Sequence, residues 1–390
     1  MLNKMCDFLL DAGHEVCCFA VKHADVNAEI PEDKLSRMQF QIVKKPRENF
    51  GGGMLKGIRS VIGNGSVALL SLPQIMRQAG NFAKKNQVDL IWSVVQGQTM
   101  INLAEPVAHY AKKPYVIQVW DPPEWWLMEN CVDRYTTAWV MKAFGKALRH
   151  AECCISASWA MADEYCKRFS CKKAIPVILG FSPERVIPNG EKNKNQFVIA
   201  LSGQLYAIEE FYALMAALNQ MQWTYQGKQI VVRLYGIHFN LYASVPSHLE
   251  LRGWLDQASL LPELADADIL YCPYWFGLRY KEPSSLSFPS KLSTYLKTGV
   301  PVLMHGPEYA SPRRFLEKYN AGYICGSMDP TEIKKILMSI MDESEENRRA
   351  VAQQGYLALT SNLTEDHMRQ AFFQSLGLPD EQEVTKQVLQ

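Results

Sequence analysis

Near-continuous apolar runs that alternate with helical patterns are the feature that most limits the fold of this chain. Val88–Val95 and Pro114–Trp120 are two such runs, and the helical pattern Ile101–Ala111 lies between them. Apolar runs of this kind are typical of parallel strands covered on both faces. The alternation restarts at Phe197 and continues through Ile230–Tyr235. The sequence therefore predicts an α/β protein with two Rossmann-like parallel sheets.

Length and composition predict two domains. A chain of 390 residues is longer than one ordinary core accommodates. Pro, Gly, Lys and Asn are concentrated in Pro183–Asn195, where we place the boundary. We expect an N-terminal domain over residues 1–190 and a C-terminal domain over 195–360. The polar residues 379–390 are expected to form a disordered tail.

The overall composition argues against several classes of protein. A net charge of +1 is unlike the strong basic excess of a nucleic-acid-binding protein. No apolar run approaches the length of about 18 residues that a membrane span requires, and we identify no secretory signal. The ten cysteines form no C-x-x-C pair and no Cys/His cluster with zinc spacing. We therefore expect reduced thiols, no metal site and a cytoplasmic protein.

The stretch Phe288–Val302 reads as a loop, a helix and a strand. Pro289 and Ser290 can open the helix, and Gly299 can end it. Such a helix directs its free N–H groups and its positive dipole end toward the preceding loop, and Lys291 adds a full charge. This pattern suits a diphosphate. An ordinary capped helix is the alternative, and the spacing alone favours it.

Phe288–Val302 also resembles the FPSKL-x-x-YL-x-x-G-x-PVL stretch of group-1 glycosyltransferases, a retaining family with the two-domain GT-B fold. The resemblance extends in weaker form over most of the chain. It implies a UDP- or GDP-sugar donor, no permanently bound cofactor, and a helix over 361–378 that returns to the first domain. The residues that it assigns to the donor are Gly203, Gln204, Gly236, Trp254, Leu255, Ser287, Phe288, Pro289, Ser290, Lys291, Leu292 and Thr294.

The resemblance also implies two catalytic positions. In retaining members the leaving diphosphate helps to deprotonate the acceptor on the same face, so the protein chiefly positions the reactants and stabilises charge, without a nucleophile or a metal. Lys291 would stabilise the departing diphosphate. Asp121, which follows the strand Pro114–Trp120, would orient an acceptor hydroxyl. A turn or helix cap is the more frequent use of an aspartate before proline.

Three departures from the family pattern keep a second interpretation open. The family's first strand and glycine-rich loop do not precede the helical pattern Met1–Leu10, either because the sequence begins at an internal methionine or because the protein does without them. Gln204 stands where the family has an arginine, and its two glutamates correspond to Leu286 and Thr294. A catalytically silent GT-B domain that binds a sugar nucleotide or a partner enzyme fits these departures. A GT-B epimerase would need carboxylates and a histidine converging on the cleft, and the sequence shows no clear set.

Residues 44–85 are locally basic. Eight lysines and arginines accompany a single acid, Glu48, and apolar residues are interleaved with them. A basic amphipathic surface suits anionic lipid headgroups or a lipid-diphosphate acceptor, whereas a solvated face over a core-facing stripe explains the pattern equally well. Together with the resemblance, this predicts sugar transfer to a glycan or lipid-linked acceptor in surface polysaccharide synthesis, peripherally on the inner face of the membrane.

Overall fold

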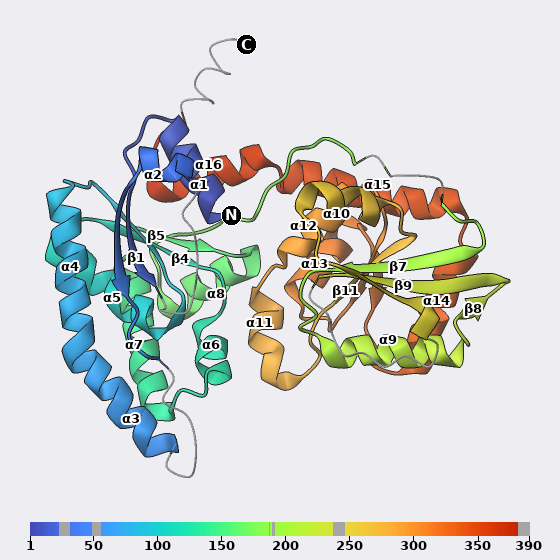
Figure 1. Cartoon of the computed structure of the whole chain (residues 1–390), viewed down its shortest axis with the longest axis horizontal. Helices are drawn as coiled ribbons and strands as arrows, with labels where there is room; N and C mark the ends of the chain where they lie inside the picture. The colour runs from blue at the N-terminus through green and yellow to red at the C-terminus, as the bar shows by residue number, and fades with distance from the viewer. Residues whose placement is uncertain (23–31, 49–55, 187, 189–191, 237–245, 381–390) are drawn as a thin grey trace. The chain divides into compact units, whose positions relative to one another are not determined.

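The computed structural model describes residues 1–22, 32–48, 56–186, 188, 192–236 and 246–380. The chain divides into two compact units (Figure 1). The N-terminal unit consists of Met1–Val177 and Arg369–Gln390, and the C-terminal unit consists of Ile178–Met368. The division precedes the expected position near residue 190. The reason is local: Val177 still donates its N–H to Ser156 in the first unit, whereas Ile178 packs on the core of the second.

The N-terminal unit contains two separate parallel sheets. One pairs β1 (Cys17–Lys22) with β2 (Gln39–Lys44). The other has the order β3 (Ile91–Val94), β4 (Tyr115–Val119), β5 (Cys153–Ser156), β6 (Ala174–Pro176). Within the described ranges no strand joins the two sheets. The helices of this unit are α1 (Leu2–Asp11), α2 (Glu32–Arg37), α3 (Lys56–Ser66), the π-helical turn η1 (Val67–Ser71), α4 (Leu72–Lys85), α5 (Gly97–Ala111), α6 (Pro123–Glu129), α7 (Arg134–His150) and α8 (Trp159–Phe169).

The C-terminal unit is built on one larger sheet. Its parallel strands have the order β10 (Leu249–Gly253), β9 (Lys228–Tyr235), β7 (Gln196–Ser202), β11 (Ile269–Pro273), β12 (Val302–His305), β13 (Tyr323–Cys325), and β8 (Thr224–Tyr225) pairs antiparallel with β9. The helical segments are α9 (Ile208–Gln220), η2 (Pro246–His248), α10 (Gln257–Ala265), η3 (Leu278–Tyr280), α11 (Lys281–Leu286), α12 (Ser290–Lys297), α13 (Ser311–Tyr319), α14 (Pro330–Asp342) and α15 (Glu345–Asn362). The last helix, α16 (Glu365–Leu376), is divided between the two units.

Alternate residues of the central strand β7 pack into two different cores. Phe197, Ile199 and Leu201 face the core that includes α9 and α14. Val198 and Ala200 face the core that includes α10, α12 and α15. Because successive strand residues point to opposite faces, a run without polar residues predicts this three-layer arrangement. Figure 1 shows the helices on both faces of the sheet.

The strand order places a topological switch point at β7. The chain moves from β7 to β9 and β10 on one side of the sheet, and β11, β12 and β13 occupy the other side. Connections that leave neighbouring parallel strands in opposite directions open a crevice at the carboxyl ends of those strands. Gly203 and Gln204 follow β7 directly, and the connection from β11 to α12 runs through η3 and α11. The expected donor residues are therefore concentrated at this edge of the sheet.

The last part of the chain was expected to form a return helix over 361–378 and a disordered tail over 379–390. The predicted return helix corresponds to α16, which begins in the C-terminal unit and from Arg369 onward belongs to the N-terminal unit. Of the expected tail 379–390, residues 381–390 lie outside the described residues. Asp380 pairs with Arg369, with 3.1 Å between the carboxylate and Nε.

Candidate functional site

Two glycine loops meet at the carboxyl ends of β7 and β9. The N–H of Gly203 donates to the carbonyl of Tyr235 over 2.8 Å. Gly236 has a φ of +145°, and a Cβ on it would lie 2.9 Å from the carbonyl oxygen of Gly203. Any other residue at 236 would therefore need both an unfavourable backbone conformation and a displaced neighbour. The two glycines therefore allow the loops to approach each other closely.

Helix α12 is anchored to the end of β7. The hydroxyl oxygen of Tyr295 accepts a hydrogen bond from the N–H of Ser202 over 2.8 Å, and both residues are buried. Pro289 occupies the N-cap position in an extended conformation, and no side chain caps the helix. The N–H of Leu292 donates to the carbonyl of Pro289 over 2.9 Å, so within the first turn the N–H groups of Ser290 and Lys291 are the ones without an acceptor in the helix itself. N–H groups of this kind, with the helix dipole in the favourable direction, are a geometry that suits an anion.

Lys291 provides a cation at this helix start. Its Nζ donates to the carbonyl oxygen of Gln204 over 3.0 Å and lies 4.5 Å from the ring centroid of Tyr206. Burial lowers the pKa of Lys291 to about 8. Among the described residues no carboxylate lies within ion-pair distance of it. The charge is therefore held by a carbonyl dipole and an aromatic face, which orient it without neutralising it.

A buried hydroxyl lies in the loop that leads into α12. The Oγ of Ser287 is enclosed, and no described residue hydrogen-bonds to it. Its main-chain carbonyl accepts from the hydroxyl of Tyr274 over 3.2 Å, which fixes the loop. Buried polar groups without a partner are uncommon in native proteins. A ligand oxygen bound at the start of α12 would satisfy this one.

The other expected donor residues divide into two groups. Leu292 is fully buried in the apolar core, and Phe288 packs edge-on against Phe315, so neither side chain is available to a ligand. The Thr294 hydroxyl donates to the carbonyl of Ser290 over 3.3 Å within the helix. By contrast, Trp254 is 76% exposed just after β10, followed by the half-buried Leu255.

Sequence reasoning missed an aromatic cluster beside Lys291. The indole N–H of Trp275 donates to the carbonyl of Tyr206 over 3.0 Å, and the rings of Trp275 and Tyr280 stack with centroids 5.1 Å apart. The buried carboxylate of Glu210 accepts from the N–H of Phe276 over 2.7 Å, and burial raises the pKa of this carboxyl. The three successive aromatics at 274–276, directly after a predicted strand, were the available signal.

Asp121 belongs to the N-terminal unit, whereas the donor residues belong to the C-terminal unit. Asp121 is half-buried after β4. The cap of the following helix α6 is Pro122, without a side-chain cap bond, so Asp121 is not the helix cap that its sequence context suggested. Capping in this region falls instead to Asp133, whose carboxylate accepts from the N–H groups of Tyr135 and Thr136 at the start of α7.

Comparisons with known proteins give a consistent fold. No protein-family model matches the chain, and no curated protein matches its sequence. Among solved structures, sucrose-phosphate synthase from Thermosynechococcus elongatus matches with a TM-score of 0.68 and 13% identity, over 96% of this chain and 91% of that one. HepE from Anabaena in complex with UDP gives 0.62 and 14%, over 93% and 99%. Trehalose-6-phosphate synthase from Burkholderia multivorans gives 0.59 and 11%, over 96% and 99%.

These neighbours are retaining glycosyltransferases of the GT-B fold. The chain therefore has the GT-B fold that the sequence predicted. At these identities the likeness concerns the fold. It does not assign a reaction to the chain. Among the described residues no helix is long and apolar enough to cross a membrane.

Proposed function

We propose that this protein transfers a sugar from a nucleoside-diphosphate sugar, with the donor bound by the C-terminal unit. The observation that carries the proposal is Lys291, an unneutralised cation at the uncapped start of α12. A diphosphate is the anion that best suits it, because the first N–H groups of α12 and the Lys291 ammonium belong to the same helix start. HepE was solved with UDP-glucose, which supports a UDP-sugar as the first donor to test.

The chemistry follows from the charge that develops during transfer. As the glycosidic bond to the diphosphate breaks, negative charge accumulates on the leaving oxygen, and Lys291 with the first amides of α12 stabilises it. Asp121 is proposed to orient the acceptor hydroxyl. The leaving group takes up the acceptor proton on the same face, which gives retention. Retention is also named for a trehalose-6-phosphate synthase that matches with a TM-score of 0.63.

The acceptor is proposed to be a glycan or a lipid-linked sugar, in surface polysaccharide synthesis at the inner face of a membrane. This part rests on the family resemblance and on the basic stretch 44–85. The acceptor proposal is more specific than the donor proposal, and the two can be tested separately.

Calorimetric titration with UDP and GDP tests the donor site. We expect micromolar binding of one nucleotide by the wild type and its loss in Lys291→Ala. Lys297→Ala is the matched control, because Lys297 lies at the other end of the same helix. With the cognate sugar nucleotide, transfer should fall by roughly one to three powers of ten in Lys291→Ala. Transfer within threefold of wild type would overturn the assignment of Lys291.

A catalytically silent donor-binding domain is the second candidate. Position 294, where the family has a glutamate, holds a threonine whose hydroxyl bonds within its own helix. Such a protein would bind UDP or GDP in the same titration but release no nucleotide from any UDP- or GDP-sugar offered. Absence of nucleotide binding by a folded protein would overturn both candidates.

A further inference from the structure

Helix α3 has a polar buried face. Ser60 and Asn64 are 3% and 4% exposed and point into the N-terminal unit. The Ser60 hydroxyl donates to the carboxylate of Asp133 over 2.8 Å, and the Asn64 amide donates to Ser60 over 3.1 Å. Gln98 completes the network by donating to the side-chain oxygen of Asn64 over 3.0 Å. Satisfied networks of this kind fix the orientation of a helix.

The outward face of the same helical segment is apolar. We define the apolar stripe as Ile58, Val61, Ile62, Leu69 and Leu70, whose exposed fractions range from 42% at Val61 to 78% at Leu69. The spacing of 58, 62 and 69 places them on one helical face. A surface helix of a soluble protein normally has the reverse arrangement, with apolar residues inward. A contiguous exposed apolar surface of this kind marks an interaction site.

The stripe ends where the ordinary pattern resumes. Leu69 and Leu70 lie in η1, which joins α3 to α4, and Leu72 and Ile75 of α4 are again buried. Single π-helical turns within a helix frequently occur at functional sites. Figure 1 shows α3 and α4 end to end along the N-terminal unit. The turn changes which face of this long helical segment points outward.

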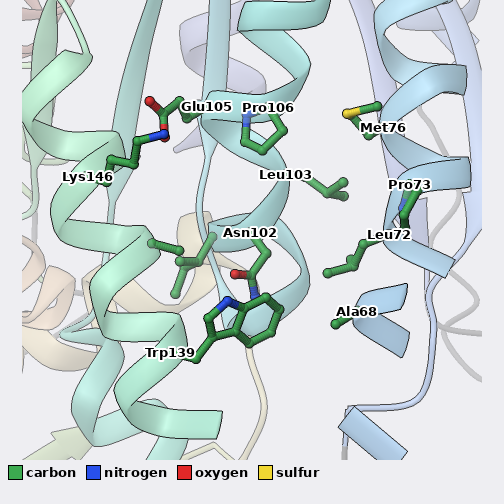
Figure 2. A pocket seen from close by; sticks show the side chains of 12 residues that line it. Ala68, Leu72, Pro73, Met76, Asn102, Leu103, Glu105, Pro106, Trp139 and Lys146 are labelled. Carbon is green, nitrogen blue, oxygen red and sulfur yellow. The ribbon is translucent and has the colours of Figure 1, made fainter. Parts of the chain in front are cut away.

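A largely apolar groove opens beside the stripe (Figure 2). It has a volume of about 350 Å³ and lies between the η1–α4 segment, α5 and α7. Its walls include Ala68 of η1, Leu72 and Met76 of α4, and Leu103 of α5. Trp139 of α7 lies at one end and is 43% exposed. Asn102, Glu105 and Lys146 are the polar and charged members of its lining.

The excess of basic residues in this region favours a negatively charged partner. Between Glu48 and Asp89 the sequence has five lysines and arginines and no acid. Arg59 is exposed on α3 beside the stripe. The groove beside the stripe also has one acid, Glu105, which pairs with Lys146. Apolar side chains accompanied by an excess of basic ones are the combination that binds anionic lipid bilayers, because the cations pair with headgroups while the apolar side chains enter the acyl layer.

We propose that the apolar stripe docks this protein onto an anionic lipid bilayer, with Leu69 and Leu70 inserted among the acyl chains. The N-terminal unit carries this surface, and the proposal does not depend on the nucleotide site. It goes beyond the proposed function by naming the residues that enter the lipid. If the donor assignment fails, vesicle binding should persist, and if docking fails, nucleotide binding should persist.

Co-sedimentation with vesicles tests the docking surface. The probes are vesicles of phosphatidylcholine alone and vesicles of equal parts phosphatidylcholine and phosphatidylglycerol. We expect the full chain to bind the second kind more tightly, and added salt to weaken that preference. The double variant Leu69→Gln, Leu70→Gln should lose about tenfold in affinity for each leucine. Leu357→Gln is the control, because Leu357 is a partly exposed leucine on α15 of the other unit.

Three results would overturn the proposal. The first is no binding of the folded wild type to either kind of vesicle. The second is equal binding by wild type and double variant. The third is a wild-type dimer in light scattering that the double variant converts to a monomer, because the stripe would then be a self-association surface. The double variant should keep the wild-type melting temperature, since the replaced side chains are exposed.

Discussion

The ammonium group of Lys291 lies 3.0 Å from the main-chain carbonyl oxygen of Gln204, so a residue at the start of α12 is held by the loop that follows β7. The contact joins segments 87 residues apart in the sequence. A carbonyl dipole orients the cation but carries no net charge. The charge of Lys291 is therefore not neutralised by the carbonyl, and the loss of water around it explains its lowered pKa.

Nucleotide affinity should depend on pH through Lys291. In the free protein the pKa of Lys291 is about 8, and a diphosphate binds the protonated form. The contribution of Lys291 to affinity should be nearly constant below about pH 7 and fall by about tenfold between pH 7 and pH 9, because binding then requires proton uptake. Lys291→Arg keeps its charge over this range and should abolish the dependence. Titration calorimetry measures both, and a wild-type affinity that is flat over this interval contradicts the role of Lys291.

Tyr295→Phe should weaken nucleotide binding without touching the nucleotide. It removes the acceptor for the buried N–H of Ser202, which should lower the free energy of unfolding by about 1–3 kcal/mol. Because α12 then loses its anchor to β7, we expect nucleotide affinity to fall by about tenfold. Tyr271→Phe is the matched control: it removes a buried hydroxyl that bonds His305 and the main chain of Glu210. It should destabilise similarly but leave affinity unchanged. Equal affinities of the two variants would show that the anchor is only structural.

Gly236→Ala should disrupt the contact between the two glycine loops. The added Cβ would lie 2.9 Å from the carbonyl oxygen of Gly203, at a φ that disfavours alanine. We expect a loss of stability of about 1–3 kcal/mol and reduced nucleotide affinity. Gly227→Ala provides the comparison, since Gly227 also has a positive φ but a Cβ there meets nothing within 4 Å. It should cost about 1 kcal/mol and spare binding. If Gly236→Ala bound the nucleotide with unaltered affinity, the loop at Gly236 would have no part in nucleotide binding.

Acid sensitivity of the fold should arise in part from His305. This residue is fully buried; its Nε2 donates to the carbonyl of Ser327, and its Nδ1 lies 2.7 Å from the Tyr271 hydroxyl. Burial lowers its pKa from 6.5 to about 4. The folded state therefore resists protonation that the unfolded state accepts, so this contribution is complete above pH 6.5 and is lost as the pH falls toward 4. The loss should be about 2 kcal/mol between pH 7 and pH 5.

Urea unfolding at the two pH values measures this loss. His305→Gln is less stable at both values, but it lacks the titrating group and should lose less stability on acidification. The expected difference between wild type and variant is the contribution of His305 alone. An identical loss in the two proteins would place the acid sensitivity elsewhere.

The sequence predicted the local elements around the donor site well. Pro289 and Ser290 at the start, the buried spacing of Leu292, Tyr295 and Leu296, and Gly299 at the end gave the helix that the structure contains. These predictions succeed because capping and helical periodicity depend on residues within a few positions of one another. The resemblance to the glycosyltransferases supplied the GT-B fold, which the comparisons confirm. The roles of the individual donor residues stay predictions.

What the sequence determined by itself is the α/β class, the two-domain fold and the helix that begins at Ser290. The tertiary structure decided which faces of these elements are buried. Along residues 56–76 the pattern shows apolar and basic side chains but does not say which face meets water. Leu72 and Ile75 point inward, whereas Ile62 and Leu69 point outward. The physical reason is that Ser60 and Asn64 find hydrogen-bond partners in Asp133 and Gln98, which lie far away in the sequence and come close only when the chain folds.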